Sequence, residues 1–131
     1  MPFKVLIVDD SKATRELIAS IVEAVDECIC VEAASGFDAL KVLPRHQFAL
    51  IITDINMPDI NGLELINFVK KNPNYRDTPL IIVSTEASEQ DRRRGLALGA
   101  TDYLVKPFAP EQLLALVRRH LGLLTTSASA T

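Results

Sequence analysis

The chain has 131 residues, and its 14 Lys and Arg against 17 Asp and Glu give a net charge of −3. Apolar residues make up 48% and charged residues 24%, which is typical of a globular domain and excludes a disordered chain. A single domain of this length buries roughly two-thirds of its unfolded surface, so its core needs neither disulfides nor a metal.

Three further features limit the class of protein. The sequence has no apolar run long enough to span a membrane and no signal-peptide pattern at its start. Its mild acidity disfavours a nucleic-acid binder that relies on phosphate neutralisation. Cys28 and Cys30 supply only half of a tetrahedral metal site, so we expect reduced thiols packed as small apolar groups. We therefore expect a soluble cytoplasmic domain that binds neither membrane nor nucleic acid directly.

Short apolar runs alternate with segments of helical periodicity along the chain. The runs occupy residues 3–8, 29–33, 48–53, 80–83 and 103–105. The strongest of them, VLIV, ALIIT and LIIV, are apolar at successive positions, which predicts strands that are covered on both faces. Such strands are typical of a parallel sheet that lies between two layers of helices.

The segments between the runs predict five helices. The first presents an apolar stripe, with Arg15, Glu16 and Glu23 mostly outside it, and the stripe consists of Leu17, Ile18, Ile21, Val22 and Val25. Capping residues, prolines and glycines bound the others, at about residues 35–44, 62–72, 88–99 and 110–121. Five β-then-α units predict a doubly wound α/β domain over residues 1–122. Residues 123–131 are small and polar, and we expect a disordered tail.

Polar residues follow four of the predicted strands at their carboxyl ends. In chain order they are Asp9, Asp10, Asp54, Ser84, Thr85 and Lys106. Ligands of open parallel sheets bind outside these ends, so three carboxylates, one or two hydroxyls and one ammonium should share a crevice. The stretch VDDSKATR after the first strand has no glycine, which excludes the simple Gly-rich phosphate loops.

This set of residues predicts an aspartyl-phosphate site. Clustered carboxylates repel one another unless a cation lies between them, and Mg²⁺ prefers such oxygen ligands. The ion would leave Asp54 ionised as a nucleophile and offset the charge of an incoming phosphoryl group. Lys106 supplies a second positive charge, and the Ser84 hydroxyl can donate to a phosphoryl oxygen.

Four stretches together give the chain a resemblance to the receiver domains of two-component response regulators, over residues 3–121. They are VLIVDDS, IITDINMPDINGLEL, PLIIVST and GATDYLVKPF, each at the end of the expected strand. The resemblance implies a flavodoxin-like fold, with a five-stranded parallel sheet in the order 2-1-3-4-5 and five helices. Ser-Thr-Glu after the fourth strand, in a domain that then stops, is most similar to the stand-alone chemotaxis (CheY-like) type.

The resemblance also implies a role for each residue of the phosphoryl site. Asp54 is the phosphoacceptor, supplied by a histidine kinase or a phosphotransfer domain. Asp10 and Asp54 give carboxylate oxygens to Mg²⁺, Asn56 gives its backbone carbonyl, and Asp9 acts largely through water. Lys106 pairs with the phosphoryl group and the site carboxylates.

Other residues are implied to shape the site or to transmit the signal. Ser84 corresponds to the switch hydroxyl and Tyr103 to the switch aromatic, although an inward Tyr can also be plain core. Asn56 and Glu86 correspond to two variable positions that tune loss of the phosphoryl group. Thr85 stands where many receivers carry Ala or Gly, which narrows access and leaves a second hydroxyl nearby.

Two backbone features follow from the same resemblance. The peptide bond between Lys106 and Pro107 is expected to be cis. The loop after Asp54 is expected to be shaped by Met57, Pro58 and Gly62.

The resulting prediction is a phosphorylation-activated signalling switch that assists its own phosphorylation and dephosphorylation but is not an enzyme in the usual sense. Its phosphorylated form changes affinity for a downstream protein, in a pathway such as chemotaxis, through the surface of the fourth helix, fifth strand and fifth helix. Two alternatives stay open: a receiver-like adaptor that works without phosphorylation, and a Mg²⁺-dependent phosphohydrolase that uses an aspartyl-phosphate. The short loops leave little room for the substrate pocket that a hydrolase needs.

Overall fold

The computed structural model describes residues 3–25, 27–85 and 89–122. Five strands are present in this part of the chain: β1 (Phe3–Val8), β2 (Cys28–Ala33), β3 (Leu50–Thr53), β4 (Leu80–Ser84) and β5 (Asp102–Val105). The helices of the same residues are α1 (Lys12–Glu23), α2 (Gly36–Val42), the 3-10 helix η1 (Leu43–Arg45), α3 (Gly62–Lys71), α4 (Glu89–Leu98) and α5 (Pro110–His120). None of these helices combines the length and the apolar composition that crossing a membrane requires.

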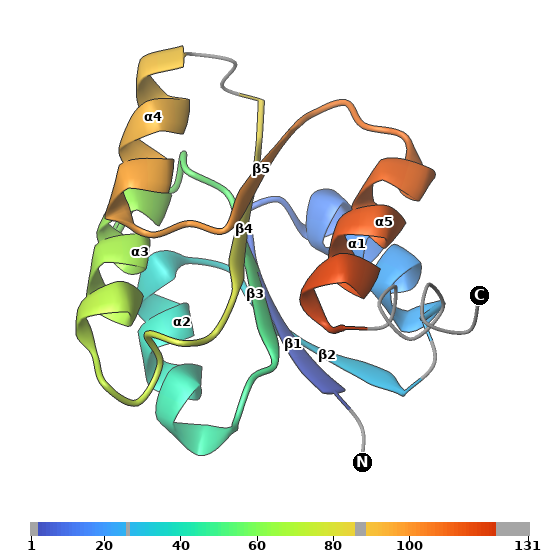
Figure 1. The fold of residues 1–131 in the computed structure, drawn as a ribbon, viewed down its shortest axis with the longest axis horizontal. Coiled ribbons are helices and arrows are strands. Elements are labelled where there is room, and N and C mark those ends of the chain that lie inside the picture. The colour runs from blue at the N-terminus through green and yellow to red at the C-terminus, as the bar shows by residue number, and fades with distance from the viewer. Residues whose placement is uncertain (1–2, 26, 86–88, 123–131) are drawn as a thin grey trace.

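The strands form one parallel sheet in the order β2-β1-β3-β4-β5. Helices α1 and α5 cover one face of the sheet, and α2, α3 and α4 cover the other (Figure 1). This arrangement confirms the predicted doubly wound fold and its strand order. The order reverses beside β1, so the carboxyl ends of β1 and β3 border the crevice where such sheets bind ligands.

The core consists of two clusters, one on each face of the sheet. In β1, Val5 and Ile7 pack in the cluster with α1 and α5, whereas Leu6 and Val8 pack in the other cluster. All four are at most 1% exposed. Successive apolar residues therefore serve opposite helical layers, which confirms the prediction made from the unbroken apolar runs.

The structure corrects several predicted boundaries and one predicted core position. The strand expected from residue 48 begins at Leu50, and α2 ends at Val42, with Pro44 in the following 3-10 turn. Leu17 is 51% exposed, although it was expected in the apolar stripe of α1. At about 100° per residue it lies to one side of the arc through Ile18 and Val22, which are buried.

Two predicted helix ends are confirmed by local geometry. The backbone N–H of Asp38 donates to Oγ of Ser35 at 3.0 Å, which makes Ser35 the N-cap of α2. Gly99 follows α4 with φ of +118°, a conformation that favours glycine. The predicted start of α4 at Ser88 lies outside the described residues, and so does the predicted tail at 123–131.

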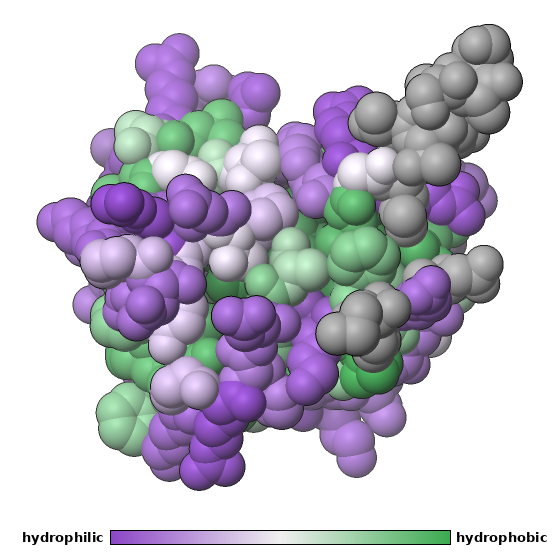
Figure 2. Space-filling view, turned by 60° about the horizontal axis from the view of Figure 1, so that its bottom comes forward, coloured by the Kyte–Doolittle hydropathy of each residue, from purple (hydrophilic) through white to green (hydrophobic). Residues whose placement is uncertain are grey.

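The exposed apolar side chains are spread over both helical layers. On the face drawn in Figure 2, green apolar patches are separated by hydrophilic side chains. The large ones are Leu17, Ile29, Phe37, Phe68, Leu96 and Val105. Each of these is between 38% and 55% exposed.

Candidate functional site

Three aspartates meet at the carboxyl ends of two neighbouring strands. The backbone N–H of Asp54 donates to the carbonyl of Val8 at 2.9 Å, so the β1–β3 ladder continues one residue past the end of β3. One carboxylate oxygen from each of Asp9, Asp10 and Asp54 lies within 4.8 Å of the other two. Asp9 is 1% and Asp54 8% exposed, whereas Asp10 is exposed to solvent. The structure thus brings together the three carboxylates that the sequence placed at strand ends.

Lys106 reaches these carboxylates from the end of β5. Its Nζ lies 2.7 Å from Oδ2 of Asp9 and 3.3 Å from Oδ2 of Asp54. Only 14% of its side chain is exposed, so this ammonium sits between two buried carboxylates and offsets their repulsion. Breaking such a buried arrangement by removing one partner would leave uncompensated charge. The peptide bond between Lys106 and Pro107 is cis, as expected.

Backbone donors fix the two buried carboxylates. Oδ1 of Asp9 accepts from the N–H of Ser11 at 2.8 Å. Oδ1 of Asp54 accepts from the N–H groups of Ile55 at 2.6 Å and Asn56 at 3.4 Å. These bonds engage Oδ1, whereas Oδ2 of Asp54 contacts the Lys106 ammonium.

The first residue of α3 forms a hydrogen bond with the loop that follows Asp54. The N–H of Gly62 donates to the carbonyl of Ile55 at 2.8 Å. A Cβ atom at Gly62 would collide with the carbonyl oxygen of Asp54 and with the backbone of Ile55. Glycine is therefore required here by close approach of the backbone rather than by an unusual φ.

The same loop also packs closely against the first turn of α2. A Cβ atom at Gly36 would collide with the carbonyl oxygen of Ile60. Oδ2 of Asp59 accepts from the N–H of Phe37 at 3.2 Å. Burial opposes ionisation of Asp59, but hydrogen bonds from the Ile60 N–H, the Ser35 hydroxyl and the Phe37 N–H lower its pKa. The sequence analysis missed the contacts of Asp59 with Ser35 and Phe37, because these two residues lie over 20 positions away in the chain.

The predicted signalling residues occupy distinct environments. Ser84 ends β4 and is fully buried, whereas Thr85 is exposed. Tyr103 is half-buried and packs against the core cluster on the α2–α4 side of the sheet. Asn56 is exposed beside the carboxylates. Glu86 lies outside the described residues.

The donor atoms fit a hard divalent cation. The site offers carboxylate oxygens from three residues, two of them buried, with a single ammonium among them. Mg²⁺ and similar ions take oxygen ligands and are commonly held by one or two carboxylates plus water. Among the described residues no buried side-chain nitrogen or oxygen lacks a hydrogen-bond partner, so the charged network is fully connected.

The cysteines do not take part in this site. Both are free, Cys28 is buried and Cys30 is partly buried on β2. Burial, followed by the neighbouring carboxylate of Glu23, raises the pKa of the Cys30 thiol to about 12. A thiol with so high a pKa is a poor nucleophile near neutral pH, in agreement with the predicted packing role.

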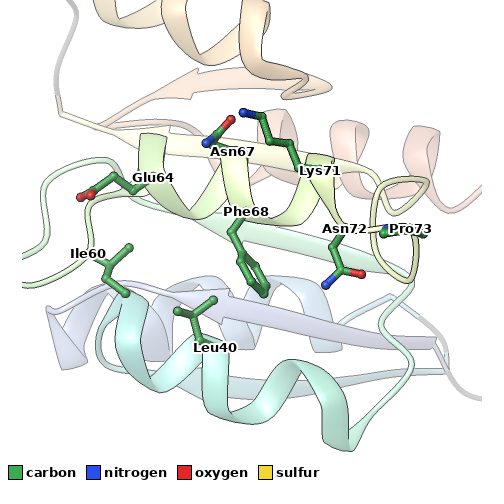
Figure 3. A pocket seen from close by; sticks show the side chains of 8 residues that line it. All are labelled: Leu40, Ile60, Glu64, Asn67, Phe68, Lys71, Asn72 and Pro73. Atoms are coloured by element: carbon green, nitrogen blue, oxygen red, sulfur yellow. The ribbon is translucent and has the colours of Figure 1, made fainter.

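A separate hollow of about 670 Å³ lies between α2 and α3. In Figure 3 Phe68 points from α3 towards α2, as does Asn72 just after the end of α3, and Leu40 faces them from α2. None of the three clustered aspartates lines this hollow. The site that can support phosphoryl chemistry is therefore at the strand ends and not in this hollow.

We predict that Gly62→Ala lowers the free energy of unfolding by about 1–3 kcal/mol, since the added methyl group collides with backbone that cannot rotate away. Urea unfolding measures this loss. Gly95→Ala is the matched helical control, because its Cβ would meet the flexible end of the Ile82 side chain. Equal stability of Gly62→Ala and wild type would contradict the close approach beneath Asp54.

Comparison with known proteins agrees with this geometry. A family model described as "Response regulator receiver domain" matches residues 5–118. The chain is 36% identical over 120 residues to the chemotaxis protein CheY homolog of Campylobacter jejuni, covering 91% of this chain and 92% of the relative. The match thus spans nearly the whole of both proteins.

Solved structures give the same result. The chemotaxis response regulator CheY4 of Vibrio cholerae superposes with a TM-score of 0.84 at 37% identity, covering 92% of this chain and 99% of that one. The Mn²⁺-bound form of response regulator Rcp1 superposes with a TM-score of 0.79 at 25% identity, covering 90% and 91% of the two chains. This chain therefore belongs to the response regulator receiver domain family, and within it is a CheY-like receiver domain.

Proposed function

We propose that this protein is a cytoplasmic switch in which Asp54 accepts a phosphoryl group from a histidine kinase or a phosphotransfer domain. The observation that carries the proposal is the position of Oδ2 of Asp54. This oxygen faces the Lys106 ammonium at 3.3 Å, inside a cluster of three carboxylates. A nucleophile, a cation and oxygen donors for a metal ion thus occupy one crevice. The likeness to chemotaxis receivers favours a pathway of that kind.

The hydrogen bonds of Asp54 support different tasks for its two carboxylate oxygens. Oδ1 is engaged by two backbone N–H groups, so Oδ2 is the oxygen that attacks phosphorus. A P–O bond forms as the P–N bond of the donor phosphohistidine breaks, and the leaving imidazole nitrogen keeps the electron pair and takes up a proton. Lys106 then donates to an oxygen of the transferred group. Such transfer depends mainly on positioning and electrostatics, which these fixed groups provide.

The carboxylates of Asp10 and Asp54 and the backbone carbonyl of Asn56 are the proposed Mg²⁺ ligands. Asp9 is already bonded to Lys106 and Ser11, which suits a contact made through water. When bound, the ion neutralises charge on the carboxylates and on the phosphoryl oxygens. The Mn²⁺-bound structure of Rcp1 supports a divalent cation in a relative with this fold.

The switch itself depends on Ser84 and Tyr103. Ser84 is buried one strand away from Asp54, and the phosphoryl group attracts its hydroxyl. Its movement frees space for Tyr103, which is half-buried beside α4. Of the described residues of α4 only Gly95 is buried, so this helix is lightly held and can repack. The phosphoryl group shifts the population only as far as it interacts differently with the two states.

The proposed output surface comprises α4, β5 and α5, where a downstream protein binds. Leu96 on α4 and Val105 on β5 are 38% and 40% exposed. The ion pairs of Arg92 and Arg93 with Glu89 are exposed at 3.4 Å, so they stabilise α4 little and leave these arginines available to a partner. Asn56 and Glu86 are the proposed positions that tune loss of the phosphoryl group.

We predict that incubation with acetyl phosphate and MgCl₂ adds one phosphoryl group to the wild-type chain and none to Asp54→Asn, as measured by intact mass. Asp77→Asn, a change of the same size at an exposed aspartate, keeps the adduct. Omitting MgCl₂ or adding a chelator should abolish it. An adduct that forms on Asp54→Asn, or one that forms equally well without Mg²⁺, would refute the assignment.

We predict that Ser84→Ala still accepts the phosphoryl group but loses the response of the α4–β5–α5 surface. Amide NMR shifts of α4 and β5, compared before and after phosphorylation, measure that response. Thr85→Ala is the control. Because Thr85 is exposed, this variant should show the same shift changes on phosphorylation as the wild type. The opposite result, with Thr85→Ala silent and Ser84→Ala responsive, would transfer the switch role to Thr85.

A further inference from the structure

Arg15 makes a contact to the site that the proposed mechanism does not use. Its guanidinium donates through Nη1 to the backbone carbonyl oxygen of Asp9 at 2.8 Å, and through Nε to Oε1 of Glu32 at 3.1 Å. Only 14% of the Arg15 side chain is exposed, against 38% for Glu32. One planar group thus links the first turn of α1, the end of β1 and the edge strand β2.

The place of Arg15 in α1 is unfavourable for a cation. It lies in the first turn after the N-cap Ser11, and its own N–H donates to the Ser11 carbonyl at 2.9 Å. Helix N-termini favour acidic side chains, yet the first turn of α1 contains none. A half-buried cation held here against the helix dipole therefore depends on its two acceptors.

The carbonyl that Arg15 binds belongs to the peptide between Asp9 and Asp10. Fixing that peptide fixes the direction in which both side chains leave the backbone. The other groups of Asp9 are also engaged: its N–H donates to Ala33 at 3.2 Å, and its carboxylate binds Ser11 and Lys106. Asp10 is exposed, and the Arg15 contact holds the carbonyl that directly precedes it.

We propose that Arg15, held by Glu32, is a positioning residue that orients the Asp9–Asp10 peptide so that its carboxylates can bind a divalent cation. This inference depends on the proposed function, because it requires that the site binds Mg²⁺. Groups that orient metal ligands in other proteins typically change metal affinity by 10-fold to 100-fold when they are removed.

Electrostatics alone predicts the opposite sign. Arg15 is a positive charge at the edge of an acidic site, so its removal should strengthen Mg²⁺ binding if charge were all that mattered. Loss of orientation should weaken binding instead. The sign of the change therefore separates a positioning role from a charge effect.

The test is calorimetric titration of MgCl₂ into the wild type, Arg15→Met and Arg15→Lys. We expect Arg15→Met to raise the dissociation constant for Mg²⁺ about 10-fold, as for other orienting groups. Arg15→Lys keeps the charge but has no planar fork, so we expect an intermediate loss. A dissociation constant that is unchanged or lower in Arg15→Met overturns the proposal. If Arg15→Met does not fold, wild-type affinity in Arg15→Lys overturns it.

Two control variants separate positioning from general effects. Arg119→Met removes the same charge at the opposite edge of the sheet, where Arg119 lies 3.9 Å from Asp102. Val117→Ala weakens the core under α5, where Val117 is fully buried. Both should keep the wild-type dissociation constant. A loss in Val117→Ala as large as in Arg15→Met would make the effect one of stability and refute the proposal.

A double-mutant cycle tests the part played by Glu32. Because Glu32 acts through Arg15, adding Glu32→Gln to Arg15→Met should weaken Mg²⁺ binding no further. Additive losses would show that Glu32 acts independently. Failure of the proposed function gives a different result, since the wild type itself would then bind no Mg²⁺.

Discussion

The structure depends on the repulsion between acidic side chains that the fold forces together. Asp9 and Asp54 are buried at the ends of adjacent strands, where hydrogen bonds of the β1–β3 ladder leave them no freedom to separate. Water screens buried charges poorly, so their repulsion must be offset by a cation. Lys106 provides one positive charge at 2.7 Å and 3.3 Å. The remaining negative charge is the basis of the proposed site for a divalent ion and then for a phosphoryl group.

The surroundings of the site combine rigid support of the loop after Asp54 with weak packing of α4. Gly62 and Gly36 allow the loop after Asp54 to lie against α3 and α2 with no room for a side chain. By contrast α4, which lies next to α3 on the same face of the sheet, buries only Gly95 among its described residues. In the proposed switch, a change of charge at Asp54 would therefore displace α4 more readily than the supporting loop. This difference in packing favours a response in α4 over one in the loop after Asp54.

Much of this arrangement could be predicted from the sequence. Unbroken apolar runs gave the parallel sheet, and the topology of such sheets placed Asp9, Asp54 and Lys106 at one edge. The strand order came from the resemblance to receiver domains, because periodicity does not specify which strands are neighbours. The structure also corrected details: Leu17 lies beside the buried arc of α1 and not within it. The contact of Arg15 with Glu32, 17 residues away, has no local signal, since a helical pattern does not reveal which polar side chain reaches another element.

Mg²⁺-dependent stabilisation tests the central claim most directly. An ion at about 100 times its dissociation constant stabilises the folded state by about 2.7 kcal/mol, which urea unfolding with and without MgCl₂ can resolve. If unrelieved carboxylate repulsion creates the site, Mg²⁺ should stabilise Lys106→Met more than it stabilises the wild type, because that variant lacks the cation that offsets the repulsion. Mg²⁺ should stabilise Asp54→Asn less than the wild type, because that variant lacks one of the repelling charges. Equal stabilisation of all three proteins would contradict the account, because the ion would then bind without responding to the charges that are said to attract it.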